Sequence, residues 1–122
     1  MISVTKIFEF AAAHCLPNHE GLCQNLHGHG FRLEIEVTGQ VKTEGPETGM
    51  IIDFSDLKEI VNDLIISRLD HSYLNDKFAN PTAETMVERI ADLLQSEWIL
   101  SCSLVRVRLW ETPTSYAEWR AE

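Results

Sequence analysis

The sequence lacks the features of a membrane, secreted or nucleic-acid-binding protein. No segment approaches the roughly 20 apolar residues that a membrane-spanning helix needs, and the N-terminus MISVTKIFEF lacks the basic start and apolar run of a signal peptide. Positive charge is scarce, because 10 Lys and Arg stand against 19 Asp and Glu. The net charge of −9 would repel a phosphate backbone. We therefore expect a cytoplasmic protein that binds neither membranes nor nucleic acids.

Cysteines are few, and linkers, repeats and low-complexity segments are absent. Cys15, Cys23 and Cys102 are an odd number in a chain without an export signal, which predicts free thiols; a Cys15–Cys23 bridge is the disfavoured alternative. Cys15 and Cys102 are expected to be small core residues. A length of 122 residues with 44% apolar content is typical of one globular domain, so we predict a single domain over residues 1–122.

Alternating apolar residues predict two strands, each with histidine at one end. The alternation runs through residues 8–14 up to His14, and through residues 27–37 beginning with His27 and His29. A period of two places each set on one face of a strand. If the strands pair antiparallel, the loop between them brings His14 close to the other two histidines. Three imidazoles are therefore predicted to converge at one end of a sheet.

The middle of the chain has helical periodicity. Apolar residues recur at helical spacing in DFSDLKEIVNDLIISRLDH, residues 53–71, where Ser55 is the predicted N-cap. The same spacing recurs in NPTAETMVERIADLLQSEW, residues 80–98, where Thr82 or Asn80 is the predicted cap. The sequence thus predicts two amphipathic helices in succession.

Strand alternation returns near the end of the chain. Val105, Val107 and Leu109 are in line with Glu111, and a weaker strand is predicted around Tyr116–Trp119. Glu111 is then a potentially buried acid, with an arginine salt bridge or a solvent-facing strand end as the alternatives. The order β-β-α-α-β-β predicts an α+β fold, with two helices on one face of an antiparallel four-stranded sheet.

The histidines, a cysteine and an Asp-His pair suggest a site with metal chemistry. Three neutral imidazoles can hold zinc and leave one position open for water or substrate; the alternative is three separate polar residues at strand ends. Cys23 precedes His27 by four residues, and could act as a general base or as a fourth ligand that closes a structural site. Asp70 beside His71 could relay a proton, or serve only for capping and solubility.

Six segments together resemble the 6-pyruvoyl-tetrahydropterin synthase family, and the similarity runs nearly end to end: AAAHCLP, CQNLHGHG, GMIIDFSDLK, LDHSYLN, NPTAE and WETPTSYAEW. Within this family, the bacterial branch that acts in queuosine biosynthesis is the most similar. The resemblance implies the tunnelling fold, in which the sheets of several subunits form a barrel with active sites at the subunit interfaces. It also implies a homohexamer built from two trimers.

The resemblance further implies a role for each candidate residue. The zinc ligands are then His14, His27 and His29, the catalytic base is Cys23 with Asp70 and His71 as its relay partners, and the pterin anchor is Glu111. In the family, the relay pair and the anchor come from subunits adjoining the one that holds the metal.

The substrate that the resemblance implies is 7,8-dihydroneopterin triphosphate. The implied products are 6-carboxytetrahydropterin, acetaldehyde and triphosphate. Two alternatives stay open: a synthase that eliminates only triphosphate to give the pyruvoyl product, and a non-catalytic zinc module in which Cys23 is a structural ligand. No triphosphate cradle stands out, and the unranked candidates are Lys6, His19, Arg32 and Lys42.

Overall fold

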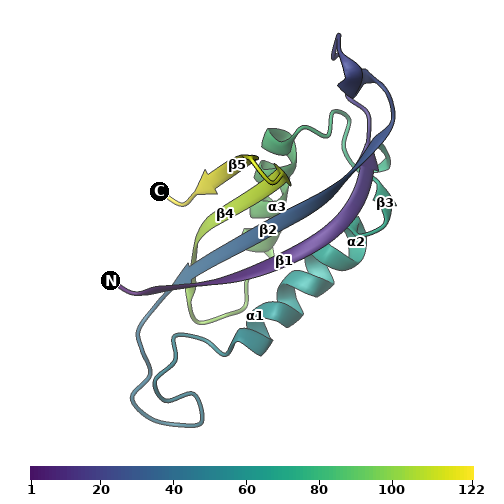
Figure 1. The fold of residues 1–122 in the computed structure, drawn as a ribbon. Coiled ribbons are helices and arrows are strands. Elements are labelled where there is room, and N and C mark those ends of the chain that lie inside the picture. The colour runs from purple at the N-terminus through teal and green to yellow at the C-terminus, as the bar shows by residue number, and fades with distance from the viewer.

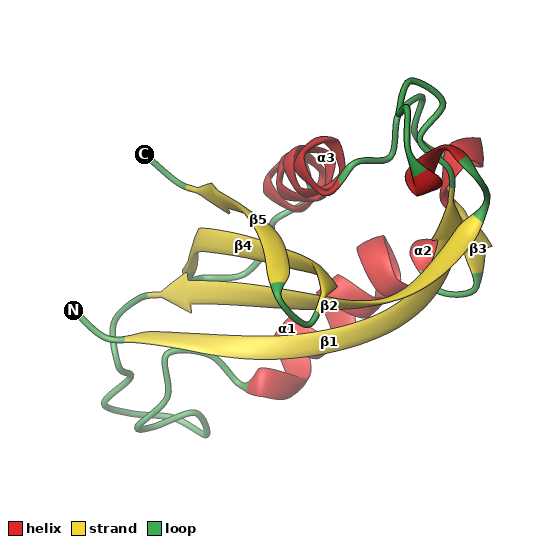
Figure 2. Ribbon diagram, turned by 45° about the horizontal axis from the view of Figure 1, so that its top comes forward, coloured by secondary structure: helices red, strands yellow, loops and turns green.

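The computed structural model describes all residues from Met1 to Glu122 and shows a five-stranded sheet with helices packed on one face (Figure 1). The strands are β1 (Ser3–His14), β2 (His27–Thr38), β3 (Ser72–Tyr73), β4 (Ser103–Thr112) and β5 (Ser115–Arg120). The helices are α1 (Phe54–Val61), α2 (Ser67–Leu69) and α3 (Ala83–Ser96). The sheet order β3-β1-β2-β4-β5 leaves the sheet open, with β3 and β5 at its edges (Figure 2).

The central strands β1 and β2 form the predicted antiparallel pair, and His14 lies opposite His27 at one end of it. Alternate side chains of both strands face the helices, as the period of two predicts. The Phe10 and Phe31 rings stack on this face, with their centroids 5.0 Å apart. The segment between β1 and β2, dark blue in Figure 1, extends beyond the sheet at the histidine end.

The prediction of four strands was incomplete. Strand β3 has two residues and pairs in parallel with Ala12 and Ala13 of β1, whereas the other strand pairs are antiparallel. A two-residue strand is too short to show any alternation, so the sequence carries no periodic signal for it. Strand β5 confirms the weaker strand predicted around Tyr116–Trp119.

Strand β4 contains a β-bulge that breaks the predicted alternation. The adjacent residues Glu36 and Val37 of β2 pair with Arg106 and Leu104, which leaves Val105 as an extra residue on β4. Leu104 is consequently buried in the core and Val105 is only partly buried. The prediction that Val105 shares the core face was therefore wrong. The alternation holds from Arg106 to Trp110, and a second irregularity follows at Glu111, in the pairing with β5.

The first predicted helix is one helical segment from Phe54 to Leu69, in which π-helical residues Asn62–Ile66 separate α1 from α2. Its N-cap is Asp53, whose carboxylate accepts a hydrogen bond from the Ser55 backbone N–H at 2.9 Å. The prediction of Ser55 as the cap was therefore wrong by two residues.

Helix α3 begins in a turn that also approaches the histidines. Thr82 is the N-cap, one of the two predicted, and its hydroxyl oxygen accepts from the Thr85 backbone N–H. The Thr85 hydroxyl in turn donates to the Asn80 carbonyl at 2.6 Å. These bonds hold the intervening residue, Pro81, in place.

The core is a single cluster of 24 buried apolar residues between the sheet and the helices. Cys102 belongs to it, as predicted, and burial raises the pKa of its thiol. Cys15 is only half-buried, so its assignment to the core was wrong. All three cysteines are free thiols, as predicted. None of the helices combines the length and the apolar content that crossing a bilayer requires.

Candidate metal and catalytic site

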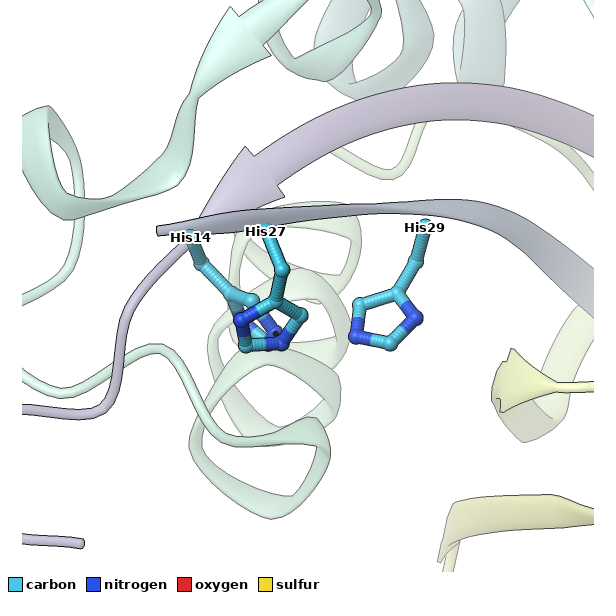
Figure 3. Close-up of side chains that lie close together, drawn as sticks. All are labelled: His14, His27 and His29. Carbon is cyan, nitrogen blue, oxygen red and sulfur yellow. Dashed lines mark hydrogen bonds between the residues drawn. The ribbon is translucent and has the colours of Figure 1, made fainter. Parts of the chain in front are cut away.

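Three imidazole rings meet at one end of the β1–β2 pair (Figure 3). One ring nitrogen from each of His14, His27 and His29 lies within 4.8 Å of the others. The His14 side chain is fully buried, and the other two are partly buried. The structure thus brings the three imidazoles together, as the strand alternation and pairing predict.

Hydrogen bonds set the tautomers of two of these rings. Nδ1 of His14 lies 2.9 Å from the Pro81 carbonyl oxygen, and Nδ1 of His27 lies 2.7 Å from the Asn25 carbonyl oxygen. A carbonyl oxygen can only accept, so each Nδ1 carries a proton, and in the neutral ring the lone pair is on Nε2. The two Nε2 atoms face each other at 2.9 Å. Two lone pairs at this distance repel each other unless a proton or a cation lies between them.

The third ring also has a nitrogen without a partner. Nε2 of His29 is buried and makes no hydrogen bond; the nearest carboxylate oxygen, Oε1 of Glu111, is 3.5 Å away. Burial lowers the pKa of His29, the Glu111 carboxylate opposes this shift, and the two neighbouring imidazoles lower it further. His29 is therefore neutral at pH 7, the form that binds metals. The donor set of three imidazoles fits an ion such as zinc and leaves one coordination position open.

Glu111, near the end of β4, contacts this cluster from within the same chain. Its side chain is 22% exposed, so it is partly and not fully buried. Its carboxylate lies 3.5 Å from His29 and makes no ion pair with an arginine, so the arginine salt-bridge alternative was wrong. It borders a cavity of about 670 Å³ between α3 and β5. A cavity of this size suits a small-molecule ligand.

Asp70 and His71 form a pair at the edge of the sheet, where β3 adjoins β1. Oδ1 of Asp70 accepts from the Ala11 backbone N–H at 2.9 Å and lies 3.0 Å from Nδ1 of His71. The Ala11 hydrogen bond is the main reason that the pKa of Asp70 lies below its ordinary value. His71 adopts a left-handed backbone with φ of 58°, and its ring is 83% exposed. The pair forms but is not part of the histidine cluster in its own chain.

Cys23 lies in the short 3-10 turn Leu22–Gln24, within the loop between β1 and β2. Its carbonyl accepts from the Leu16 backbone N–H at 2.7 Å, which closes the base of the loop, and its side chain is partly buried. The thiol is not among the ligand atoms that gather around the three histidines. The structure therefore does not place Cys23 as a fourth ligand.

The four candidate triphosphate contacts are scattered. Lys42 is held by the Glu47 carboxylate at 3.0 Å and the Ile51 carbonyl at 2.9 Å, so its ammonium group is already engaged. Arg32 is half-exposed, lies 3.6 Å from the Glu34 carboxylate and borders a second cavity that it shares with Asp70. Both cations are paired with a glutamate, and Arg32 is the more exposed of the two.

The sequence interpretation missed the backbone acceptors that fix the imidazoles. The Pro81 and Asn25 carbonyls orient His14 and His27, but every residue carries a carbonyl, so residue type gives no signal for them. The NPTAE segment, which contains Pro81, was predicted only as the start of a helix.

Chelation distinguishes an open site from a structural one. Because the core is built without the histidine cluster, we expect EDTA-treated protein to keep its far-UV circular dichroism spectrum. Zinc at about 100 times its Kd should then raise the free energy of unfolding by about 2.7 kcal/mol. Cooperative unfolding on chelation, followed by the same spectrum, would instead indicate a structural metal.

Comparison with known proteins identifies the family. The sequence profile described as 6-pyruvoyl tetrahydropterin synthase matches residues 3–122. The 6-carboxy-5,6,7,8-tetrahydropterin synthase of Haemophilus influenzae is 37% identical, with 98% of this chain and 99% of that protein covered. The protein of the same name from Synechocystis is 43% identical, with coverage of 95% and 91%.

Solved structures agree on the fold. The 6-pyruvoyl tetrahydropterin synthase of Caenorhabditis elegans superimposes with a TM-score of 0.82 at 24% identity, over 99% of this chain and 96% of that one. At this identity the likeness establishes the fold only, whereas the family profile and the bacterial relatives cover nearly the whole sequence. The chain therefore belongs to the 6-pyruvoyl tetrahydropterin synthase family.

Proposed function

We propose that the protein converts 7,8-dihydroneopterin triphosphate to 6-carboxy-5,6,7,8-tetrahydropterin, with release of acetaldehyde and triphosphate, as a step in queuosine biosynthesis. The names of the bacterial relatives support this reaction. The structural observation that carries the proposal is the group of three imidazoles beside Glu111 and its cavity, in which Nε2 of His14 and His27 face each other and Nε2 of His29 has no partner. This arrangement offers a metal with an open position next to space for a small molecule.

In this proposal, His14, His27 and His29 hold a zinc ion. Bound there, zinc would supply Lewis-acid chemistry that makes the hydroxyl and adjacent carbon-bound protons of the substrate side chain more acidic. The protein's own contribution is to orient His14 and His27 through the two carbonyl acceptors, and to favour the neutral form of His29 through burial.

Cys23 is the proposed base that removes a proton from the substrate side chain, and Asp70 and His71 are its relay partners. Because Nδ1 of His71 lies at hydrogen-bond distance from the Asp70 carboxylate, that nitrogen donates and Nε2 is left to accept a proton. The His71 ring is exposed, so it is accessible to a thiol from another subunit. We infer that the pair serves the Cys23 of an adjoining chain.

Glu111 is the proposed pterin anchor, whose carboxylate accepts hydrogen bonds from ring N–H groups. It lies 3.5 Å from His29 of its own chain. That an adjoining subunit supplies the anchor to each metal site stays a prediction. The cavity between α3 and β5 is where the pterin ring would then lie.

The assembly that we propose is a homohexamer of two trimers whose sheets form a barrel. The helix-free face of the sheet is polar: the Glu34 carboxylate accepts from Trp110 Nε1 at 2.6 Å and from Arg106 at 3.3 Å. Such a face suits the lining of a polar barrel, and the open sheet edges are free to pair. Sedimentation should give six times the chain mass of 13.9 kDa, and a monomer would contradict the assembly.

An anaerobic incubation of zinc-loaded protein with 7,8-dihydroneopterin triphosphate tests the reaction. Mass spectrometry should detect 6-carboxy-5,6,7,8-tetrahydropterin together with acetaldehyde, and metal-free protein should leave the substrate unchanged. The pyruvoyl product without acetaldehyde would place the protein in the other branch of the family. Unchanged substrate with zinc-loaded protein would argue against any pterin synthase activity.

A further inference from the structure

The side-chain amide of Asn75 binds the backbone of Cys15 from a segment 60 residues away in the sequence. Its Oδ1 accepts from the Cys15 N–H at 2.9 Å, and its Nδ2 donates to the Cys15 carbonyl at 2.8 Å. The backbone partners settle which amide atom is which, since an N–H can only donate and a carbonyl can only accept. Both bonds are partly buried. One side chain thus satisfies both backbone groups of Cys15.

These two Asn75–Cys15 hydrogen bonds, called the clamp below, lie at the point where β1 loses its strand neighbours. On one side, β3 pairs with Ala12 and Ala13 and then ends; on the other, the pairing with β2 ends at His14. Cys15 is the next residue and has no strand partner, so Asn75 replaces one for its backbone. The Tyr73 hydroxyl, from the same segment, lies 3.5 Å from Cys15 Sγ.

We propose that Asn75 is a positioning residue for the metal site, which acts by fixing the backbone next to His14. The inference rests on the proposed role of His14 as a metal ligand. Beyond Cys15 the chain enters the loop to β2, so the two Asn75 hydrogen bonds fix the last residue between the ligand His14 and that loop. Pro81 fixes the His14 ring through Nδ1, and Asn75 fixes the backbone that carries the ring. Asn75 also joins the Asp70–His71 segment to the metal end of β1.

The test is the isosteric variant Asn75→Asp. It keeps an acceptor for the Cys15 N–H but places an oxygen against the Cys15 carbonyl, where the amide had donated. Residues that orient metal ligands typically change affinity by about 10- to 100-fold. We expect the zinc affinity of Asn75→Asp to fall about tenfold, and the visible spectrum of the cobalt-substituted protein to change.

The matched control is Asn62→Asp, the same chemical change in the π-helical segment Asn62–Ile66, outside the strands and the turn that carry the histidine cluster. This variant should keep the wild-type zinc affinity and cobalt spectrum. Wild-type affinity and spectrum in Asn75→Asp would overturn the proposal. If that variant does not fold, hydrogen exchange in the wild type decides, because the Cys15 amide should be as protected as its neighbours in β1, and fast exchange would contradict the clamp.

These readouts separate the inference from the proposed reaction. Metal affinity and amide exchange are measured without turnover. If Asn75→Asp weakens zinc binding but the wild-type protein forms no product, the proposed role of Asn75 stands and the proposed reaction is wrong. If the wild-type protein forms product but Asn75→Asp binds zinc with unchanged affinity, the proposed reaction stands and the proposed role of Asn75 is wrong.

Discussion

Replacing His27 with alanine should abolish zinc binding and lower turnover by a factor of about 10³ or more, because Lewis-acid catalysis by a bound metal contributes several kcal/mol. His27 is the most informative ligand to remove, since its side chain is only partly buried and the fold should persist. The loss of its Nε2 also removes the close contact with Nε2 of His14. Metal analysis should therefore find no bound zinc in this variant, and the same preparation should form almost no product.

The matched control for metal binding is His19→Ala, which removes an imidazole from the same region but not from the cluster. His19 is exposed, and its Nδ1 accepts only from the nearby Gly21 N–H. This variant should still bind one zinc ion per chain. Full zinc occupancy in His27→Ala would show that the ligand set has been assigned incorrectly.

Replacing Cys23 with alanine should lower turnover by about 10²- to 10⁴-fold, the usual contribution of a general acid or base, while zinc binding stays intact. The reason is geometric: the thiol lies outside the group of ligand atoms and so should act on the substrate without holding the metal. A kcat measurement beside a zinc titration of the same preparation checks both halves of this expectation.

Cys102→Ala is the matched loss of a thiol elsewhere in the chain. Cys102 is buried beneath the other end of the sheet, and its replacement should reduce stability slightly and leave turnover unchanged. Undiminished turnover in Cys23→Ala would remove this residue from the mechanism. Loss of zinc in Cys23→Ala would instead return it to the role of a structural ligand.

The convergence of the histidines could be predicted because it depends only on strand alternation and on the pairing of neighbouring strands. His14 and His27 lie opposite each other because each stands at the end of an alternating strand and the two strands pair antiparallel. The bulge at Val105 could not be predicted, because an extra residue on one strand depends on the register with its partner. For the same reason, the core position of Leu104 was missed.

The surroundings of the site were harder to predict than its ligands. The contact between Glu111 and His29 depends on the register in which β4 pairs with β2 and on the irregularity of β4 at Glu111. The Pro81 carbonyl and the Asn75 amide reach His14 and Cys15 from segments distant in sequence. Such contacts follow from tertiary packing, which a local pattern does not encode.

X-ray absorption at the zinc edge, on zinc-loaded protein, tests the open three-histidine site most directly. We expect a first shell of nitrogen and oxygen at about 2.0–2.1 Å, with imidazole scattering from His14, His27 and His29 and no sulfur. A sulfur neighbour at about 2.3 Å would contradict this result, because Cys23 would then close the site as a structural ligand.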